Sequence, residues 1–204
     1  MAAPGGLSDS KAMLITVEGS DGAGKSTLVA GLARELGATA LRDPGGVALA
    51  ERIRALSADP ELDVDPHTEA LLFAAARAQL VAEKVRPLLD AGETVLIDRY
   101  IDSSLAYQGG GRELGIEAVR TINLFGVGGL LPDRTILLRL DPVDGLARIT
   151  DRPAGRLELS GGEFFARVAQ TYDDLAAAEP DRFIVLDATQ PPDTVLAAAV
   201  KALS

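Results

Sequence analysis

Five short apolar runs recur along the chain, separated by stretches in which apolar residues repeat with the period of a helix. Runs that are apolar at nearly every position are typical of parallel strands buried on both faces. The pattern predicts strands at Met13–Glu18, Ala38–Arg42, Thr94–Asp98, Thr135–Leu140 and Phe183–Asp187. Because strands alternate with helices, we expect right-handed crossovers and a three-layer α/β fold, with a five-stranded parallel sheet covered by helices on both faces.

Local signals mark the start of several of the intervening helices. Asp65 is a suitable N-cap with Pro66 at the first helical position, and this helix is expected to run to Leu89. Ser160 and Glu163 have the spacing of a capping box ahead of a helix that ends at Ala178. The remaining helices are expected at Ser26–Leu36, Val47–Ser57, Ile116–Phe125, Pro142–Ile149 and from Pro191 to Leu203.

Residues 19–26 read GSDGAGKS and directly follow the first predicted strand. They match G-x-x-x-x-G-K-[ST], a loop whose glycines let backbone N–H groups converge on the phosphates of a nucleotide. Lys25 is expected to reach the terminal phosphates, and the Ser26 hydroxyl to ligate Mg²⁺. The motif therefore predicts a P-loop NTPase fold that binds a nucleoside triphosphate. The expected nucleotide-binding residues are Gly19, Ser20, Asp21, Gly22, Ala23, Gly24, Lys25, Ser26 and Thr27.

Charged side chains also follow the third predicted strand. In open parallel sheets ligands bind beyond the carboxyl ends of the strands, where the P-loop, residues 42–46 and residues 98–100 all fall. Asp98 ends an apolar strand, as expected of the carboxylate that holds Mg²⁺ in P-loop enzymes. Arg99 follows at once and carries the planar donor group that suits a phosphate. We expect Ser26 and Asp98 to bind the metal ion and Arg99 to act on phosphate.

Two further groups of residues have both a structural and a functional interpretation. Phe73 and Arg77 are four apart in one predicted helix, so they share a face. Taken separately, Phe73 is typical of a core residue and Arg77 of a surface charge. Together they suit stacking on a base and hydrogen bonding to its edge. Arg148, Arg152 and Arg156 recur at intervals of four, either as a solvated segment or in a lid, about residues 143–160, that neutralises phosphoryl charge.

Composition narrows the class of protein. The 204 residues suffice for one domain with a substantial core, taken as 13–204 after a disordered tail at 1–12. We expect a cytoplasmic location, because no apolar run approaches the roughly 20 residues that span a bilayer and no cleavable leader is recognisable. The net charge of −10 argues against nucleic acid and anionic membranes as partners. The absence of cysteine excludes disulfides and thiolate metal sites.

With these residues identified, the chain from Met13 onward resembles the thymidylate kinase family. The segments that carry the resemblance are 18–27 (EGSDGAGKST), 42–46 (RDPGG), 71–77 (LLFAAAR), 98–109 (DRYIDSSLAYQG), 132–133 (PD) and 156–158 (RLE). The resemblance implies the reaction ATP + dTMP → ADP + dTDP, with Mg²⁺ as cofactor, in a homodimer. The uncharged P-loop position at Ala23, together with an arginine-bearing lid, is similar to the bacterial type of the family.

The resemblance also implies roles for single residues. Phe73 would stack on thymine while Arg77 hydrogen-bonds its edge; Tyr107 would lie under the deoxyribose and exclude a 2′-hydroxyl. Asp21 would bind the 3′-hydroxyl, and Glu158 would face the site from the lid. The residues implied in dTMP binding are Asp21, Arg54, Phe73, Arg77, Arg99, Ser104, Tyr107 and Gln108. Those implied in phosphoryl transfer are Lys25, Arg99, Arg148, Arg152 and Arg156.

Three positions depart from the family pattern, and other functions stay open. Asp21 and Asp43 stand where glutamate is common, and both keep the charge. Gly155 precedes Arg156 where an acidic residue is common, so the lid arginine that contacts the transferring phosphate is not fixed. The alternatives are another nucleotide kinase on the same scaffold, a GTP-binding switch or, less favoured by the charge, a nucleic-acid-binding ATPase. The Asn-Lys-x-Asp motif of guanine-specific switches does not occur.

Overall fold

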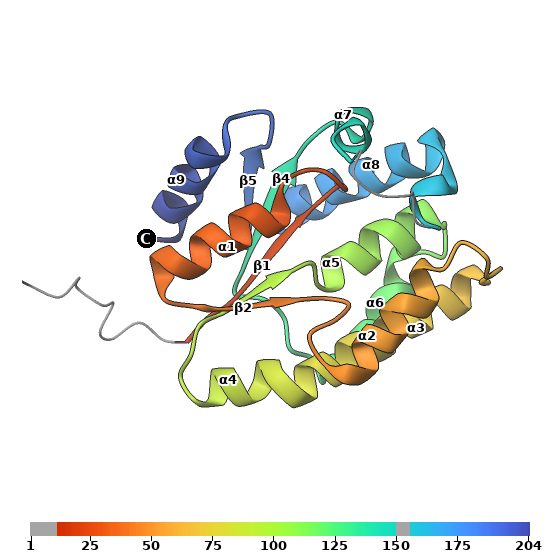
Figure 1. Cartoon of the computed structure of the whole chain (residues 1–204), viewed down its shortest axis with the longest axis horizontal. Coiled ribbons are helices and arrows are strands. Elements are labelled where there is room, and N and C mark those ends of the chain that lie inside the picture. The colour runs from red at the N-terminus through yellow and green to blue at the C-terminus, as the bar shows by residue number, and fades with distance from the viewer. Residues whose placement is uncertain (1–11, 150–155) are drawn as a thin grey trace, which may run out of the picture.

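The computed structural model describes residues 12–149 and 156–204. Its strands form one parallel sheet in the order β2-β3-β1-β4-β5, which confirms the expected five-stranded α/β fold (Figure 1). The strands are β1 Leu14–Gly19, β2 Thr39–Arg42, β3 Val95–Asp98, β4 Arg134–Arg139 and β5 Phe183–Asp187. Each lies within one or two residues of the range predicted from the apolar runs, because a buried strand is marked by its own composition.

Helices cover both faces of this sheet. The α-helices are α1 Lys25–Leu36, α2 Ala48–Ala58, α3 Pro66–Leu80, α4 Arg86–Asp90, α5 Ile101–Ser104, α6 Ile116–Val127, α7 Pro142–Ala147, α8 Gly162–Ala178 and α9 Pro192–Leu203. Two π-helical segments, η1 Val81–Val85 and η2 Leu105–Gly111, and the 3₁₀ turn η3 Glu158–Ser160 complete the described elements. Helices α1 and α9 pack together on one face, while α2, α3, α6 and α8 lie on the other side (Figure 1).

The alternation of side chains along β1 divides the core into two layers. Leu14 belongs to the apolar cluster that includes residues of α3, η2 and α8, whereas Ile15 and Val17 belong to the cluster with α1 and α9. Successive strand residues point to opposite faces of the sheet, so a strand between two helical layers carries apolar side chains on both of its faces. This is the physical reason for the continuous apolar runs in the sequence.

The register of the central strands assembles the functional edge. Val17 of β1 pairs with Asp98 of β3, and Asp98 pairs in turn with Arg42 of β2. Parallel strands end at the same edge, so the P-loop after β1, the turn after β2 and the segment after β3 converge there. The sheet thus brings together three motifs that are far apart in the sequence.

Two helical predictions differ from the structure. The helix expected to run to Leu89 is α3, η1 and α4 in succession, since a π-turn interrupts the regular hydrogen bonding. The segment 101–111, for which no element was predicted, is helical and forms α5 and η2. The capping box is wrong: Gly161 caps α8 without a side-chain bond, because Glu158–Ser160 forms a 3₁₀ turn. Asp65 is confirmed as N-cap, accepting from the backbone N–H of His67 at 2.8 Å and Thr68 at 3.3 Å.

Some expectations fall on parts of the chain that are not described. Of the tail predicted at 1–12, only Ala12 lies within the described residues. Residues 150–155 of the lid predicted at about 143–160, which include Arg152, lie outside the described residues. Among the described helices, none combines the length and the apolar character needed to cross a membrane.

Candidate active site

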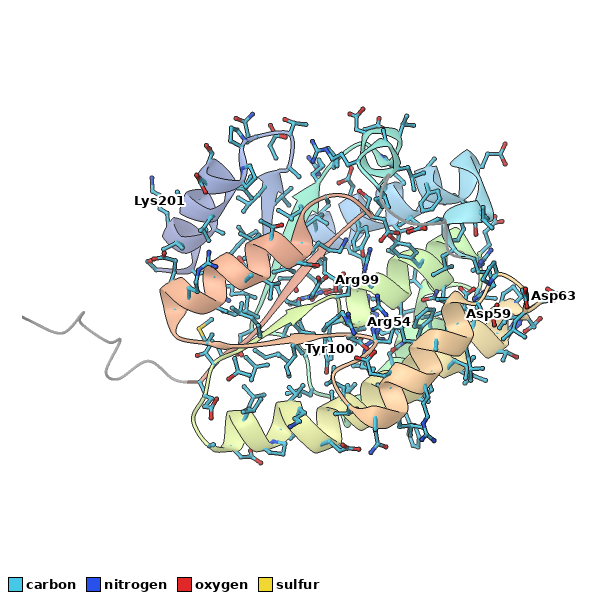
Figure 2. The ribbon with its side chains drawn as sticks, viewed as in Figure 1. Arg54, Asp59, Asp63, Arg99, Tyr100 and Lys201 are labelled. Carbon is cyan, nitrogen blue, oxygen red and sulfur yellow. The ribbon has the colours of Figure 1, made fainter. Side chains whose placement is uncertain are left out.

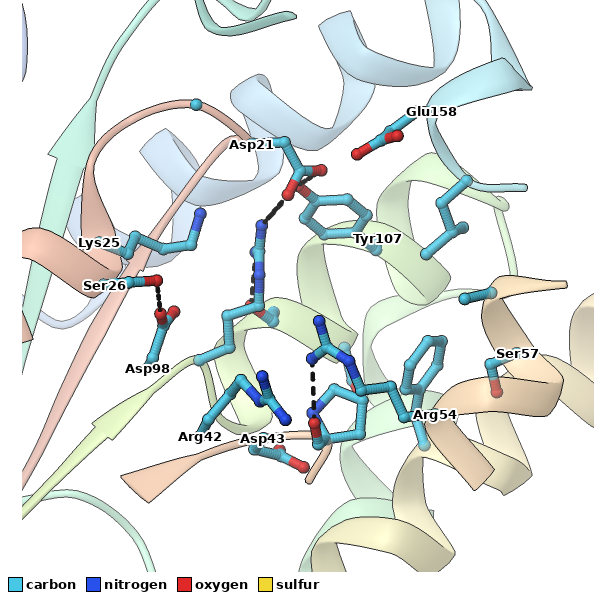
Figure 3. A pocket seen from close by; sticks show the side chains of 18 of the residues that line it. Asp21, Lys25, Ser26, Arg42, Asp43, Arg54, Ser57, Asp98, Tyr107 and Glu158 are labelled. Carbon is cyan, nitrogen blue, oxygen red and sulfur yellow. Dashed lines mark hydrogen bonds and ion pairs between the residues drawn. The ribbon is translucent and has the colours of Figure 1, made fainter. Parts of the chain in front are cut away.

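A cavity of about 690 Å³ opens beyond the carboxyl ends of the strands (Figure 3). The predicted site residues in its wall are Asp21, Gly22, Gly24, Lys25, Ser26, Thr27, Arg54, Phe73, Arg77, Asp98, Arg99, Ser104, Tyr107, Gln108, Arg148 and Arg156. Gly19, Ser20 and Ala23 are buried and do not line the cavity; a Cβ atom on Gly19 would come within 2.5 Å of the Leu138 carbonyl oxygen. The structure therefore gathers most of the predicted residues around one space.

The P-loop has the conformation that phosphate binding requires. Gly22 and Gly24 have φ angles of 77° and 91°, which side chains other than glycine adopt at a cost. Helix α1 begins directly after Gly24 with no side-chain cap, so its first N–H groups are available to an anion. Lys25 Nζ donates to the Ser20 carbonyl oxygen at 2.7 Å, across the loop. Burial, reinforced by the nearby Arg99 charge, lowers the pKa of Lys25 to about 8.

Ser26 and Asp98 have the chemistry of a magnesium site. The Ser26 hydroxyl donates to Asp98 Oδ2 at 2.5 Å, so the two predicted ligands lie side by side (Figure 3). Both supply hard oxygen atoms, which Mg²⁺ prefers. No group of three or more His, Cys, Asp or Glu suited to a metal ion occurs among the described residues. Mg²⁺ needs no such group, since it usually takes one or two protein oxygens together with water and substrate phosphates.

Arg99 connects the P-loop to the opposite wall of the cavity. Its Nη2 lies 2.6 Å from Asp21 Oδ1, and its Nη1 donates to the Gly19 carbonyl oxygen at 3.0 Å. The guanidinium also stacks over the Tyr107 ring, 5.0 Å from the centroid. Arg99 and Arg54 both point into the central region of the molecule (Figure 2). These contacts fix the Arg99 guanidinium at the point where the motifs meet.

Asp21 and Tyr107 form the next link in this arrangement. The Tyr107 hydroxyl donates to Asp21 Oδ2 at 3.0 Å. Burial alone would raise the pKa of Asp21, but Arg99 and Lys25 outweigh it and lower the pKa to about 2. Glu158 lines the same part of the cavity, and its carboxylate points toward Asp21 and Tyr107 (Figure 3). Asp21 is thus a fixed negative charge at the mouth of the P-loop.

Glu18 was not assigned a role from the sequence. In the structure it is linked to Arg99 through the Ser103 hydroxyl. It is fully buried and accepts from the Tyr100 backbone N–H at 2.7 Å and the Ser103 hydroxyl at 2.5 Å. Ser103 in turn accepts from Arg99 Nη1 at 3.0 Å. Burial, with the charge of Asp102, raises the pKa of Glu18 to about 7. Its only signal in the sequence is a charged residue at the end of an apolar strand.

Arg77 is buried among partners from three elements. Its Nε lies 2.5 Å from Asp43 Oδ2, and its Nη1 donates to the Ser104 hydroxyl at 2.9 Å and to the Asn123 side-chain oxygen. A buried guanidinium requires such partners, so its burial on an alanine-rich helix was the signal that a counter-charge exists. The sequence did not reveal Asp43 and Asn123 in this role, because they come from distant segments.

The remaining predicted cations occupy different parts of the wall. Arg54 donates to the Pro44 carbonyl oxygen at 3.1 Å, at the turn after β2 (Figure 3). Arg148 donates to the Ala188 carbonyl oxygen at 3.2 Å. Arg156 is turned toward Glu69, with its Nη2 2.6 Å from Oε2, rather than toward the P-loop. Each has a partner within the protein, and Arg156 is the one among them that contacts a carboxylate.

Comparisons with known proteins agree with this geometry. The family model described as thymidylate kinase matches residues 17–199. The thymidylate kinase of Deinococcus radiodurans is 49% identical over 201 residues, covering 96% of this chain and 98% of the relative. That of Bifidobacterium longum is 47% identical over 195 residues, covering 91% and 94%. The crystal structure of thymidylate kinase from Ehrlichia chaffeensis superposes with a TM-score of 0.80 at 28% identity, covering 95% and 99%. The chain therefore belongs to the thymidylate kinase family of P-loop phosphotransferases.

Proposed function

We propose that this chain transfers the γ-phosphoryl group of ATP to dTMP and releases ADP and dTDP. The observation that carries the proposal is the single cavity that joins the P-loop around Lys25 to the aromatic and amide groups of Phe73 and Gln108. Two phosphorylated ligands placed end to end would meet beside Arg99. Positioning two anions that repel each other is the main task of such a catalyst, and it requires cations near both.

The dTMP end would be formed by α2, α3, α5 and η2. Phe73 supplies an aromatic face for the base, and Gln108 supplies an amide for its edge. Tyr107, hydrogen-bonded to Asp21, would lie under the deoxyribose, so a 2′-hydroxyl would meet its ring. The proposed dTMP-binding residues are Asp21, Arg54, Phe73, Arg77, Arg99, Ser104, Tyr107 and Gln108.

The ATP end would be formed by the P-loop and its cations. An oxygen of the dTMP phosphate attacks the γ-phosphorus, the bond to the β-bridging oxygen breaks, and ADP leaves. Lys25 and the N-terminal N–H groups of α1 would stabilise the negative charge on the transferring group. Mg²⁺ held by Ser26 and Asp98 would neutralise charge on the ATP phosphates. Arg99, Arg148, Arg152 and Arg156 are proposed as further cations for this step.

A coupled assay for ADP release tests the function. With Mg-ATP and dTMP we expect turnover, which chelation of the metal abolishes. Thymidine, dUMP and CMP serve as competing acceptors, and dTMP is expected to be strongly preferred. Equal rates on ribonucleotides would contradict the role of Tyr107. Tight GTP binding without turnover of any monophosphate would contradict the kinase proposal and favour a switch.

We propose a homodimer on the basis of exposed apolar side chains. Phe125 of α6 is 90% exposed and Leu71 of α3 is 57% exposed, and the two helices pack against each other. Large exposed apolar groups on adjoining helices are typical of a face that a partner covers.

We also propose that residues 13–204 act as one kinase domain in the cytoplasm, where ATP and nucleoside monophosphates are found.

A further inference from the structure

Glu69 is a buried carboxylate that none of the proposed steps uses. It lies in the first turn of α3 and is fully inaccessible to solvent. Removing a carboxylate from water costs several kcal/mol unless charged partners and hydrogen bonds replace the solvent. Its partners come from outside its own helix: Gln108 and Arg112 of η2, and Arg156 ahead of η3. A group satisfied this completely fixes the orientation of whatever it binds.

The partner that reaches the cavity is Gln108. Its Nε2 donates to Glu69 Oε1 at 2.8 Å, and the residue lines the cavity beside the proposed base site. A carboxylate balanced by guanidinium groups accepts hydrogen bonds and does not donate them, so the amide must turn its NH₂ toward Glu69. Among the hydrogen bonds of the described residues, none uses the Gln108 Oε1 atom. The carbonyl oxygen of this amide therefore remains as the acceptor for a ligand in the cavity that Gln108 lines.

An acceptor at this place distinguishes between pyrimidines. Thymine and uracil carry an N–H donor at ring position 3, whereas cytosine carries a bare acceptor nitrogen there. A site that hydrogen-bonds one edge rejects the base with the opposite pattern strongly, because a buried polar group would remain unpaired. The orientation of this amide thus contributes to base selection alongside the other residues of the base site.

The arginines hold the carboxylate in the orientation that this requires. Arg112 contacts both carboxylate oxygens: its Nη2 lies 3.1 Å from Glu69 Oε2, and its Nε donates at 3.3 Å to Oε1, the atom that also accepts from Gln108. Arg156 Nη2 lies 2.6 Å from Oε2. Arg156 is fixed further by a bond from its Nε to the Ser57 carbonyl oxygen at 3.1 Å. Arg112 stacks over the Phe164 ring, 4.8 Å from the centroid. These contacts prevent the carboxylate from rotating.

We propose that Glu69 is the positioning residue for base selection: it turns the carbonyl oxygen of Gln108 into the cavity, so that the site accepts a pyrimidine with a protonated N3. The inference rests on the proposed dTMP kinase activity. It makes Glu69 a determinant of specificity that never touches the substrate.

The substitution Glu69→Gln tests this orientation. Two guanidinium groups would attract the carbonyl oxygen of the new amide, leaving its NH₂ to face Gln108. Gln108 would then turn over and present its own NH₂ to the base. We expect the ratio of kcat/KM for dTMP to that for dCMP to fall by about 100-fold, while KM for ATP stays the same. The ratio of dTMP to dUMP should stay within about twofold, because both bases carry N3–H.

The substitution Gln108→Leu shows whether Glu69 acts through the amide. Alone, it should lower the dTMP to dCMP ratio by about tenfold or more. Adding Glu69→Gln in the Gln108→Leu background should change that ratio by less than about twofold, since the intermediary is already gone. Glu117→Gln is the matched control, because it makes the same chemical change at an exposed carboxylate of α6 that does not line the cavity; we expect it to keep the wild-type ratio.

Three outcomes would overturn the inference. These are an unchanged dTMP to dCMP ratio in folded Glu69→Gln, an unchanged ratio in Gln108→Leu, and an equal effect of Glu69→Gln with and without Gln108. Where Glu69→Gln lowers Tm too far to assay, an unchanged ratio in Gln108→Leu still overturns the inference. A wild-type enzyme that phosphorylates no dTMP would instead contradict the proposed function.

Discussion

Arg99 is bonded directly to Asp21, with its Nη2 atom 2.6 Å from Oδ1. The contact joins the segment after β3 to the P-loop and places a cation and an anion at the meeting point of the two proposed ligands. Both side chains are largely buried, so the pair is stronger than a surface ion pair. The contact brings residues that are far apart in the sequence together at one edge of the sheet.

The substitution Asp21→Asn should weaken dTMP binding. It removes the charge that holds Arg99 and the acceptor that Tyr107 uses, while the shape of the side chain is kept. We expect KM for dTMP to rise about tenfold with a smaller change in KM for ATP, measured by steady-state kinetics. Asp63→Asn is the matched control, since Asp63 is exposed and lies far from the cavity (Figure 2). Equal effects of both variants would contradict a role for Asp21.

Lys25→Ala should nearly abolish turnover while leaving dTMP binding intact. Loss of one preorganised cation at the transferring group is expected to lower kcat by about 100-fold or more. Lys201→Ala on the outer surface of α9 is the control and should behave as wild type (Figure 2). In the wild type, kcat/KM for ATP should also fall as pH rises through about 8, because the free-enzyme pKa of Lys25 lies there. A value of kcat/KM for ATP that does not change across this pH range would contradict a role for the protonated amine of Lys25.

Phe73→Ala should mainly affect dTMP. Removing a ring that stacks on the base is expected to raise the dissociation constant for dTMP about tenfold, as measured by calorimetry. Affinity for ATP should not change, because Phe73 lies away from the P-loop. Unchanged dTMP affinity together with a lowered Tm would show that Phe73 contributes to packing and does not stack on the base.

Glu18→Gln should change how stability depends on pH. Burial and Asp102 raise the pKa of Glu18 from 4.5 to about 7 in the folded protein. A carboxyl group whose pKa is higher in the folded protein stabilises the fold in full at pH values below its unfolded-state pKa. This stabilisation is lost as the pH rises through its folded-state pKa. Between about pH 4.5 and pH 7, the wild type should therefore lose on the order of 3 kcal/mol relative to the variant.

Urea unfolding at several pH values measures this difference directly. The variant keeps an oxygen that can accept from Ser103, so its folded structure should persist. Parallel pH profiles for the two proteins would show that Glu18 does not titrate in this range.

Phe125→Asp should convert the proposed dimer to a monomer. A charge at the centre of an apolar contact face is costly to bury, and Phe125 is 90% exposed in the single chain. Light scattering should then give the mass of one chain, with the far-UV circular dichroism unchanged. A wild type that is already monomeric would contradict the dimer proposal, whatever the variant does.

Much of the fold and part of the site followed from local sequence patterns. The strands are marked by their own apolar composition, and the P-loop by glycines and Lys25 at fixed spacing. Ser26 and Asp98 could be paired because both follow central strands that end at one edge. Each of these depends on residues near one another in the chain or on a general rule of parallel sheets.

What only the tertiary structure decided is which side chains meet across long separations. Arg77 meets Asp43 and Asn123, Arg99 rests through Ser103 on Glu18, and Arg156 turns to Glu69. The sequence determined that such charges exist and that a buried one needs a partner. It could not determine the partner, because the pairing depends on how helices pack over the sheet, and packing depends on the shapes of many side chains at once.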